Sequence, residues 1–240
     1  MAKTPGGQVT QTQLLVGLLV VAAFVIGLLF PKNGSLFQGT ATNPVASTAP
    51  AGAPATPAPG QKVDVSNGHF PVLGNKNAKV TVVEFADFRC PFCEQFFTNV
   101  EPSLKKDYID TGKVQFYFRQ YAFLGPASTV AANAAECANE QGKFWDFHDY
   151  LYKNQPPETD TSMYTVDKLT QVAGTLGMDT NQFNSCLSSN KYQKNVDSDL
   201  SDGQKAGVNG TPTVFIDGQS MVGAQPYANF KSLIDQELAK

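Results

Sequence analysis

Two cysteines three residues apart, Cys90 and Cys93, stand where a strand pattern gives way to a helix pattern. The run 78–85 before them (AKVTVVEF) is rich in valine and threonine, which favour strands. After them, four apolar residues recur at helical spacing: Phe96, Phe97, Val100 and Leu104. The pair therefore lies at a strand-to-helix turn, and we expect Pro102 to interrupt the helix that follows.

The remaining pattern indicates an α/β domain. Residues 114–121 (VQFYFRQY) form a second strand pattern, and a helical crossover between two such strands implies parallel pairing. The stretch from about 126 to 203 is helical almost throughout and too long for a crossover, so we expect an inserted helical subdomain. An Asp217-Gly218 turn then joins two short strands, and residues 228–238 form an amphipathic helix.

The N-terminal part of the chain differs in composition from the rest. Residues 14–30 are apolar without a charge and would span roughly 26 Å as a helix. This favours a transmembrane anchor (1–32) over a cleaved signal peptide, whose apolar region is usually about 7–15 residues long. Residues 33–61 are rich in Pro, Ala and Thr and indicate a disordered linker to a folded domain (62–240).

Ligand counting argues against a metal site at the cysteine pair. A zinc site usually needs four Cys or His ligands in paired spacings. The other cysteines and both histidines have no ligand-spaced neighbour: Cys137, Cys186, His69 and His148. A structural disulfide across so short a loop would restrain little of the unfolded chain. The pair is therefore predicted to be redox-active, and we expect neither a metal nor another cofactor.

The start of a helix suits the first cysteine of the pair for attack on disulfides. Unpaired backbone N–H groups and the positive end of the helix dipole stabilise the thiolate of Cys90, which is the nucleophilic form. Cys93 lies one turn later on the same side and can close back to release a mixed-disulfide partner. Pro91 suits the first helical turn. We predict that Cys90 is the nucleophile and Cys93 the resolving thiol.

A second signal is Gly210-Thr211-Pro212-Thr213 directly before a strand, where proline cannot donate to a ladder. The two segments VEFADFRCPFCEQF and GVNGTPTVFIDG together resemble the DsbA-like disulfide oxidoreductases of the thioredoxin superfamily, in their membrane-anchored, BdbD-like form. The resemblance covers roughly residues 63–240. It implies a thioredoxin fold with the helical subdomain inserted.

The resemblance also implies roles for individual residues. A cis bond is expected before Pro212, with the Thr211 backbone pairing with an extended client peptide beside the nucleophile. Pro91 and Phe92 would line the same substrate-binding surface. Glu84 falls where the family places a carboxylate beneath the resolving cysteine, and it would exchange a proton with that thiol. The alternative for Glu84 is an outward-facing strand residue.

One position departs from the family pattern. Its best-known members carry histidine just before the second cysteine, where this chain has Phe92, which offers neither a cation nor a ring N–H to the thiolate. Potentials of such enzymes run from about −270 mV for thioredoxin to about −120 mV for the strong oxidant. We expect the oxidising half of this range.

Cys137 and Cys186 both lie in the predicted helical subdomain. Two interpretations remain open for them. As free thiols they would act as small apolar side chains, but an exported chain tends to join two such cysteines where geometry permits. We favour a structural disulfide.

The expected function is a membrane-anchored thiol:disulfide oxidoreductase on the extracytoplasmic side, which oxidises reduced exported proteins. The resemblance implies that a quinone-linked membrane thiol oxidase reoxidises it. The rivals are a reductase or isomerase with the same cysteines, and a non-catalytic peptide-binding module. A net charge of −3 without a basic cluster argues against nucleic-acid binding.

Overall fold

The computed structural model describes residues 61–240. The predicted anchor and all but the last residue of the predicted linker lie outside this range. Among the helices of residues 61–240, none is both long and apolar enough to cross a membrane.

A five-stranded sheet organises the domain, in the order β1-β3-β2-β4-β5. The central strands β2 (Val80–Ala86) and β3 (Val114–Gln120) are parallel, as predicted from the crossover between them. The other neighbours pair antiparallel: β1 (Leu73–Gly74) with β3, β4 (Thr213–Ile216) with β2, and β5 (Gln219–Val222) with β4.

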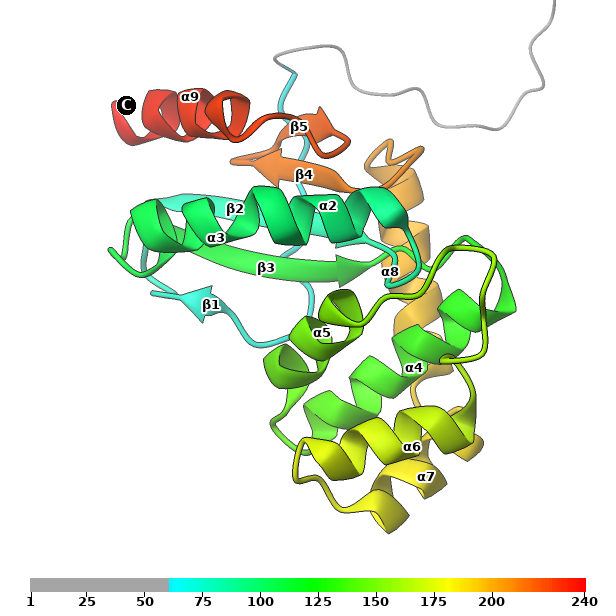
Figure 1. Ribbon diagram of the computed structural model, residues 1–240. Coiled ribbons are helices and arrows are strands. Elements are labelled where there is room, and N and C mark those ends of the chain that lie inside the picture. The colour runs from blue at the N-terminus through cyan, green and yellow to red at the C-terminus, as the bar shows by residue number, and fades with distance from the viewer. Residues whose placement is uncertain (1–60) are drawn as a thin grey trace, which may run out of the picture. The chain divides into compact units, whose positions relative to one another are not determined.

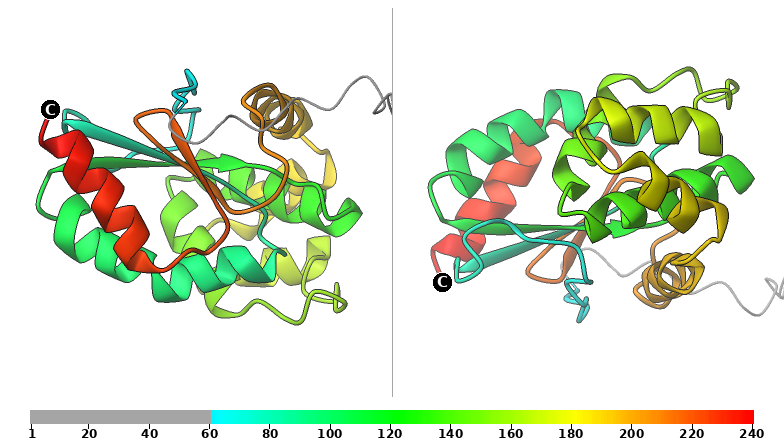
Figure 2. Two further views of the ribbon diagram at one scale, coloured as in Figure 1. Left: turned by 90° about the horizontal axis from the view of Figure 1, so that it is seen from above. Right: turned by 90° about the horizontal axis from the view of Figure 1, so that it is seen from below.

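One face of the sheet is covered by α2 (Pro91–Asn99), α3 (Glu101–Leu104) and α9 (Tyr227–Leu238) (Figures 1 and 2). The predicted interruption occurs at Val100, because Pro102 stands in the first turn of α3, and a π-helical turn, η1 (Lys105–Ile109), follows. The strand side chains on this face alternate along β2, so Val80 and Val82 are buried under these helices.

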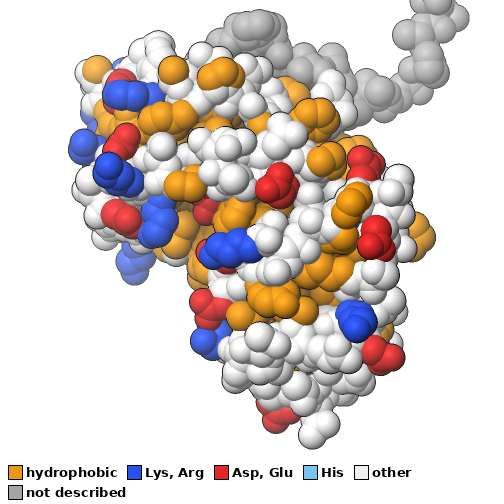
Figure 3. All heavy atoms as spheres, in the orientation of Figure 1, with side chains coloured by type: hydrophobic (Ala, Val, Ile, Leu, Met, Phe, Trp, Pro, Cys, Tyr) orange, Lys and Arg blue, Asp and Glu red, His pale blue; other side chains and the backbone are white. Residues whose placement is uncertain are grey.

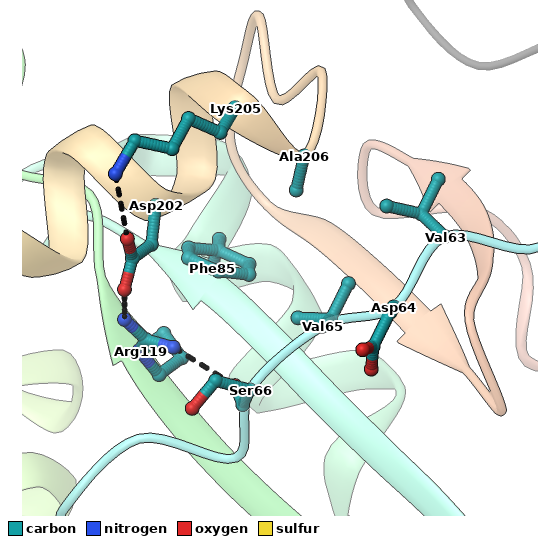
Figure 4. A pocket seen from close by; sticks show the side chains of 9 residues that line it. All are labelled: Val63, Asp64, Val65, Ser66, Phe85, Arg119, Asp202, Lys205 and Ala206. Carbon is teal, nitrogen blue, oxygen red and sulfur yellow. Dashed lines mark hydrogen bonds and ion pairs between the residues drawn. The ribbon is translucent and has the colours of Figure 1, made fainter.

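The opposite face is covered by α8 (Gln193–Lys205) and by an irregular segment, residues 61–70, which we call the strap. Figure 2 shows α8 across the sheet from α2 and α9. Val63 and Val65 of the strap pack against this face. Buried Arg119 of β3 fixes the strap and α8 on this face. It donates to the Ser66 carbonyl at 2.8 Å and pairs with Asp202 of α8 (Figure 4). It also pairs with Asp199 of α8.

The inserted helical subdomain comprises α4 (Pro126–Glu140), α5 (Phe144–Lys153), α6 (Val166–Thr175) and α7 (Thr180–Ser188), and α8 leads back to the sheet (Figure 1). Its core is rich in aromatic rings. One face of α5 is buried, as its spacing predicts: Phe144, Phe147, His148 and Leu151. The predicted α/β architecture with an inserted helical subdomain is therefore present in the structure.

Candidate active site

Cys90 is the residue that caps the N-terminus of α2, and Pro91 occupies the first helical position. Its backbone is extended, with φ −75° and ψ 121°, because the chain arrives here directly from β2. The backbone N–H of Cys93 donates to the Cys90 carbonyl at 3.0 Å, which closes the first turn. Cys90 and Cys93 are both free thiols, held one turn apart at the end of the central strand.

Hydrogen bonds stabilise the Cys90 thiolate. They lower the pKa of Cys90 from 9.0 to about 6, and the bond from the Cys93 thiol contributes most. Burial opposes this shift, while Thr211 and the backbone N–H groups of Cys93 and Phe92 add to it. In the thiol form, Cys90 Sγ donates to the Thr211 carbonyl at 3.4 Å. The N-terminal turn of α2 thus favours the anion at Cys90, as the sequence predicts.

Cys93 has the opposite character. Burial, the hydrogen bond to Cys90 and the charges of Cys90 and Glu84 raise its pKa well above 9.0. Glu84 is 2% exposed on β2, so it is an inward-facing residue rather than an outward-facing one. Burial raises the pKa of Glu84 well above its ordinary value, and the charges of Glu101 and Cys90 add to the shift. A carboxyl group that holds its proton is therefore coupled electrostatically to both thiols.

The loop before β4 lies against the nucleophile. The Thr211–Pro212 peptide bond is cis, and both residues are buried. The Thr211 hydroxyl is also buried, and its hydrogen bonding lowers the pKa of both Cys90 and Cys93. The structure thus brings together the two sequence segments on which the resemblance rests.

An apolar cavity of about 430 Å³ opens over Cys90. Among residues 61–240, the large apolar side chains with more than a third of their surface exposed are Phe92, Phe123 and Val222, and all three line this cavity. Figure 3 shows an apolar band across the middle of one face of the domain. Cys90 is only 5% exposed, so a reaction partner reaches its sulfur through this cavity.

Arg89 holds the wall of the cavity together. Its guanidinium donates to the carbonyl oxygens of Leu124 at 2.6 Å and Glu158 at 2.7 Å, which lie in two different loops that line the cavity. Asp87 supports the same loop, because its carboxylate accepts from the backbone N–H groups of Phe123 and Leu124. These contacts fix the position of the Phe123 loop relative to Cys90.

The sequence did not reveal the cavity residues Phe123, Val222 and Glu158. Phe123 follows β3, Val222 is the last residue of β5, and Glu158 precedes α6. No local sequence pattern relates positions so far apart along the chain. Phe88, two residues before the nucleophile, is 2% exposed and belongs to the core of the helical subdomain. The only local signal for Phe123 was an aromatic residue just after a strand that ends near the cysteines.

Away from this site, Cys137 of α4 and Cys186 of α7 form a disulfide. Two further hollows, of about 340 and 420 Å³, flank the strap on the other face of the sheet. The first is lined by charges that are already paired, Arg119 with Asp202 and Asp202 with Lys205 (Figure 4). No group of residues 61–240 gathers three metal-ligating side chains.

Comparison with known proteins agrees with this geometry. The family model described as Thioredoxin matches residues 66–236. A probable disulfide bond formation protein D of Bacillus cereus is 38% identical over 172 residues, which cover 70% of this chain and 78% of that protein. Disulfide bond formation protein D of Bacillus subtilis is 34% identical over 171 residues, or 70% of this chain and 77% of that protein.

This chain belongs to the disulfide bond formation protein D family of the thioredoxin fold. The crystal structure of oxidised BdbD from Bacillus subtilis superposes on this chain with a TM-score of 0.67 at 32% sequence identity. The superposed part covers 71% of this chain and 94% of the BdbD chain. The predicted resemblance to DsbA-like enzymes is confirmed. The chain is a thiol:disulfide oxidoreductase.

Proposed function

We propose that the chain is a thiol:disulfide oxidase that introduces disulfides into reduced exported proteins through Cys90 and Cys93. The opposed ionisation of the two thiols carries this proposal, because the pKa of Cys90 falls to about 6 while that of Cys93 rises well above 9.0. A stable Cys90 thiolate favours the reduced enzyme over its disulfide, and a disulfide that is readily reduced is an oxidant.

The reaction transfers two electrons from a client dithiol to the enzyme. A client thiolate attacks Cys90 Sγ, the Cys90–Cys93 bond breaks, and Cys93 leaves as a thiolate that takes up a proton. Glu84 would supply that proton, since it is buried, interacts electrostatically with both thiols and holds its own proton unusually well. A second client thiolate then attacks the client sulfur of the mixed disulfide, which forms the client disulfide and releases Cys90 as a thiolate.

The client would lie in the apolar cavity as an extended segment, with the Thr211 backbone beside its cysteine. An unfolded segment exposes the apolar side chains that this cavity accepts, whereas a folded client buries them. We expect Phe123→Ala to lower kcat/KM for oxidation of a reduced apolar peptide by about tenfold. This corresponds to the hydrophobic free energy of burying about half of a phenylalanine side chain against the client. Oxidation of reduced glutathione, which lacks apolar side chains, serves as the control and should change little.

The predicted anchor and linker complete the proposal. An uncleaved helix at residues 14–30 and the linker would hold the catalytic domain at the extracytoplasmic surface of the membrane. A membrane thiol oxidase that passes electrons to quinone would reoxidise the pair. The oxidising environment implied by this location suits the Cys137–Cys186 disulfide.

Trapping of a mixed disulfide tests the proposal against a non-catalytic peptide-binding module. The variant Cys93→Ala cannot resolve, so it should accumulate a covalent complex with a disulfide-containing client peptide, visible by non-reducing electrophoresis and mass spectrometry. Cys90→Ala is the matched control and should form none. Peptide binding without a covalent complex would favour the binding module.

The reduction potential decides between an oxidase and a reductase. We expect equilibration with glutathione to give the Cys90–Cys93 pair a potential well above that of thioredoxin, about −270 mV. A value near or below that of thioredoxin would contradict the oxidase.

A further inference from the structure

The boundary between α2–α3 and α5 holds polar groups that the exchange reaction above does not use. Cys93, Phe97 and Glu101 are spaced by four residues, so they form a row along one face of α2 and α3. His148 and Tyr152 have the same spacing on α5 and face this row: the Phe97 ring lies 5.8 Å from the His148 ring and 5.5 Å from the Tyr152 ring. The row leads from the resolving cysteine to Glu101.

Glu101 is a buried carboxyl group without a fixed partner. It is 6% exposed, and its Oε2 has no hydrogen-bond partner among residues 61–240. His148 is fully buried beside it, and its Nε2 is likewise unpartnered in the same range, although its Nδ1 lies 3.2 Å from Asp149 Oδ1. Buried polar atoms that lack partners destabilise a fold, so two at one helix boundary call for a functional explanation.

Glu101 has access to solvent on its far side. A groove of about 480 Å³ runs between α2–α3 and α5, and Glu101 lines it together with Phe97, Lys105, Asp149 and Lys153. Glu101 therefore stands between the solvent in this groove and the protein interior. The groove is separate from the apolar cavity over Cys90, and the two share none of their lining residues.

Glu84 lies on the inner side of Glu101. The alternation along β2 puts Glu84 on the same face of the sheet as Val82, which is the face that α2 and α3 cover. The charge of Glu101 is the largest electrostatic influence on the pKa of Glu84 after burial, and the charge of Glu84 in turn raises the pKa of Cys93. The acidic groups thus follow one another from the groove to the resolving sulfur.

We propose that Glu101 connects Glu84 to the solvent of this groove, so that protons enter and leave Cys93 from the α2–α5 side while the apolar cavity over Cys90 is filled by the client. The proposal rests on the assignment of Cys93 as the resolving thiol. Glu101 acts through Glu84 and is therefore a positioning residue, and His148 is the buried group that pairs electrostatically with it.

The path is needed because a client excludes water from the cavity over Cys90. When the pair is reduced, the Cys93 thiolate takes the proton of Glu84, and Glu84 is protonated again from Glu101, which draws its proton from the groove. When the pair is reoxidised, Glu84 first releases its proton to the groove through Glu101. Its carboxylate then takes the proton of the Cys93 thiol, and the Cys93 sulfur attacks the Cys90 sulfur of a mixed disulfide and expels the oxidant's thiolate. One proton is taken up from the groove in the first half-reaction and one is released to it in the second, so each half-reaction balances.

Several charged groups face Glu101 and set the pH range of this transfer. Burial raises the pKa of Glu101, and Asp149 raises it further, whereas His148 of α5, Lys105 of η1 and Lys153 of α5 lower it. The charges of Asp149 and of the three cationic side chains shift the pKa of Glu101 in opposite directions, and the net result is a pKa above its ordinary value. Glu101 can therefore take up and release protons closer to neutral pH than an exposed glutamate can.

The test measures the resolution step alone in Glu101→Gln, which keeps the shape of the side chain but cannot carry the proton. The reduced full-length protein is mixed with oxidised glutathione, quenched with acid, and alkylated for mass spectrometry, which separates the reduced, glutathionylated and oxidised forms. General acid–base groups contribute about 10²–10⁴-fold, and for a group one step removed we expect resolution about tenfold slower at pH 6.5. The difference should shrink above pH 9, where hydroxide deprotonates Cys93 directly.

Two comparisons make the result specific. Glu94→Gln alters another carboxyl group on the groove wall and should leave the pH profile of resolution unchanged. In a Glu84→Gln background, the Glu101→Gln change should have no further effect, because the path is already broken. The rate at which the glutathione adduct forms on Cys90 should match the wild type in Glu101→Gln and Glu94→Gln, which shows that the folded environment of the Cys90 thiolate is retained in both.

Resolution in Glu101→Gln that matches the wild type at every pH, or that is slowed equally at every pH, would overturn the proton path. An additive effect of the two glutamine substitutions would also overturn it. Failure of the assigned thiol chemistry looks different, because Cys90 would then form no glutathione adduct at all, even in the wild-type protein, whereas failure of the oxidase direction would appear in the reduction potential.

Discussion

Cys93 is the residue that contributes most to the ionisation of Cys90, because its thiol donates to the Cys90 sulfur. We expect the rate of Cys90 alkylation by iodoacetamide in the reduced protein to rise with pH around a midpoint of about 6. In Cys93→Ala this hydrogen bond is lost, so the midpoint should move upward, towards the ordinary cysteine value of 9.0. Mass spectrometry of the alkylated protein at a series of pH values measures both midpoints.

The Thr211 hydroxyl and the backbone N–H groups of Phe92 and position 93 remain in the Cys93→Ala variant, so part of the lowering of the Cys90 pKa should persist. Cys90→Ala provides the background, since the buried Cys93 should not react in this pH range. An unchanged midpoint in Cys93→Ala would assign the stabilisation of the thiolate to the helix terminus and Thr211. A wild-type midpoint near 9 would remove the basis of the proposed mechanism.

At the residue scale, the sequence predicted what local pattern determines. Cys90 begins a helix because a strand pattern ends before it and Pro91 suits the first turn, and the structure places it there. Glu84 could be placed only by resemblance, since its facing depends on the register of the strand. Glu101 and Phe123 were out of reach, because their importance comes from neighbours on α5 and in loops far along the chain.

At the element scale, the Cys137–Cys186 disulfide joins α4 to α7 across a separation of 49 residues. A link of that length removes chain entropy from the unfolded state worth about 4 kcal/mol. We expect the variant Cys137→Ala/Cys186→Ala to lose about this much free energy of unfolding, measured by urea denaturation, while the Cys90–Cys93 pair still exchanges with glutathione. Cys90→Ala/Cys93→Ala is the matched control, because it keeps the Cys137–Cys186 disulfide. Its free energy of unfolding is compared with that of the wild type in which Cys90 and Cys93 are reduced. Equal stability of the two double variants would show that α4 and α7 are held by packing alone.

Elements with strong periodicity could be predicted, and short or irregular ones could not. The parallel β2–β3 pair, the β4–β5 hairpin and α9 agree with the sequence pattern, and Pro102 ends α2 where proline chemistry requires. The two-residue strand β1 has no period to detect. The strap has no pattern of its own either, since its extended course depends on Arg119 and on the sheet face beneath it.

At the scale of the whole domain, the strap connects the sheet to the helical subdomain. Near its start, Lys62 pairs with Glu237 of α9 at 3.0 Å, and the Val63 N–H donates to the Gly218 carbonyl at 2.9 Å. Near its end, His69 pairs with buried Glu136 of α4 at 2.7 Å. The strap therefore ties the two halves of the domain together, and one of its two ionic contacts depends on the charge of a histidine.

The His69 contact predicts a pH-dependent contribution to stability. The hydrogen bond to Glu136 raises the pKa of His69 above 6.5; Asp199 supports this shift, while burial and Arg119 oppose it. A raised pKa stabilises the fold fully below pH 6.5, and the stabilisation is lost as pH rises through the pKa of the folded state. The free energy of unfolding of the wild type minus that of His69→Asn should therefore be largest near pH 6 and decline towards pH 9, as measured by urea denaturation.

Lys62→Gln is the control for the His69 measurement, because the pKa of Lys62 lies above 10.5 and its ammonium group stays charged across this range. Its effect on stability should be constant from pH 6 to pH 9. A His69→Asn difference that is equally flat would show that the imidazole contributes by packing on Phe70, from which its ring centroid lies 4.4 Å. A difference that grows with pH would mean that His69 is bound as the neutral ring, and the strap would then hold the helical subdomain without an ionic contact at this end.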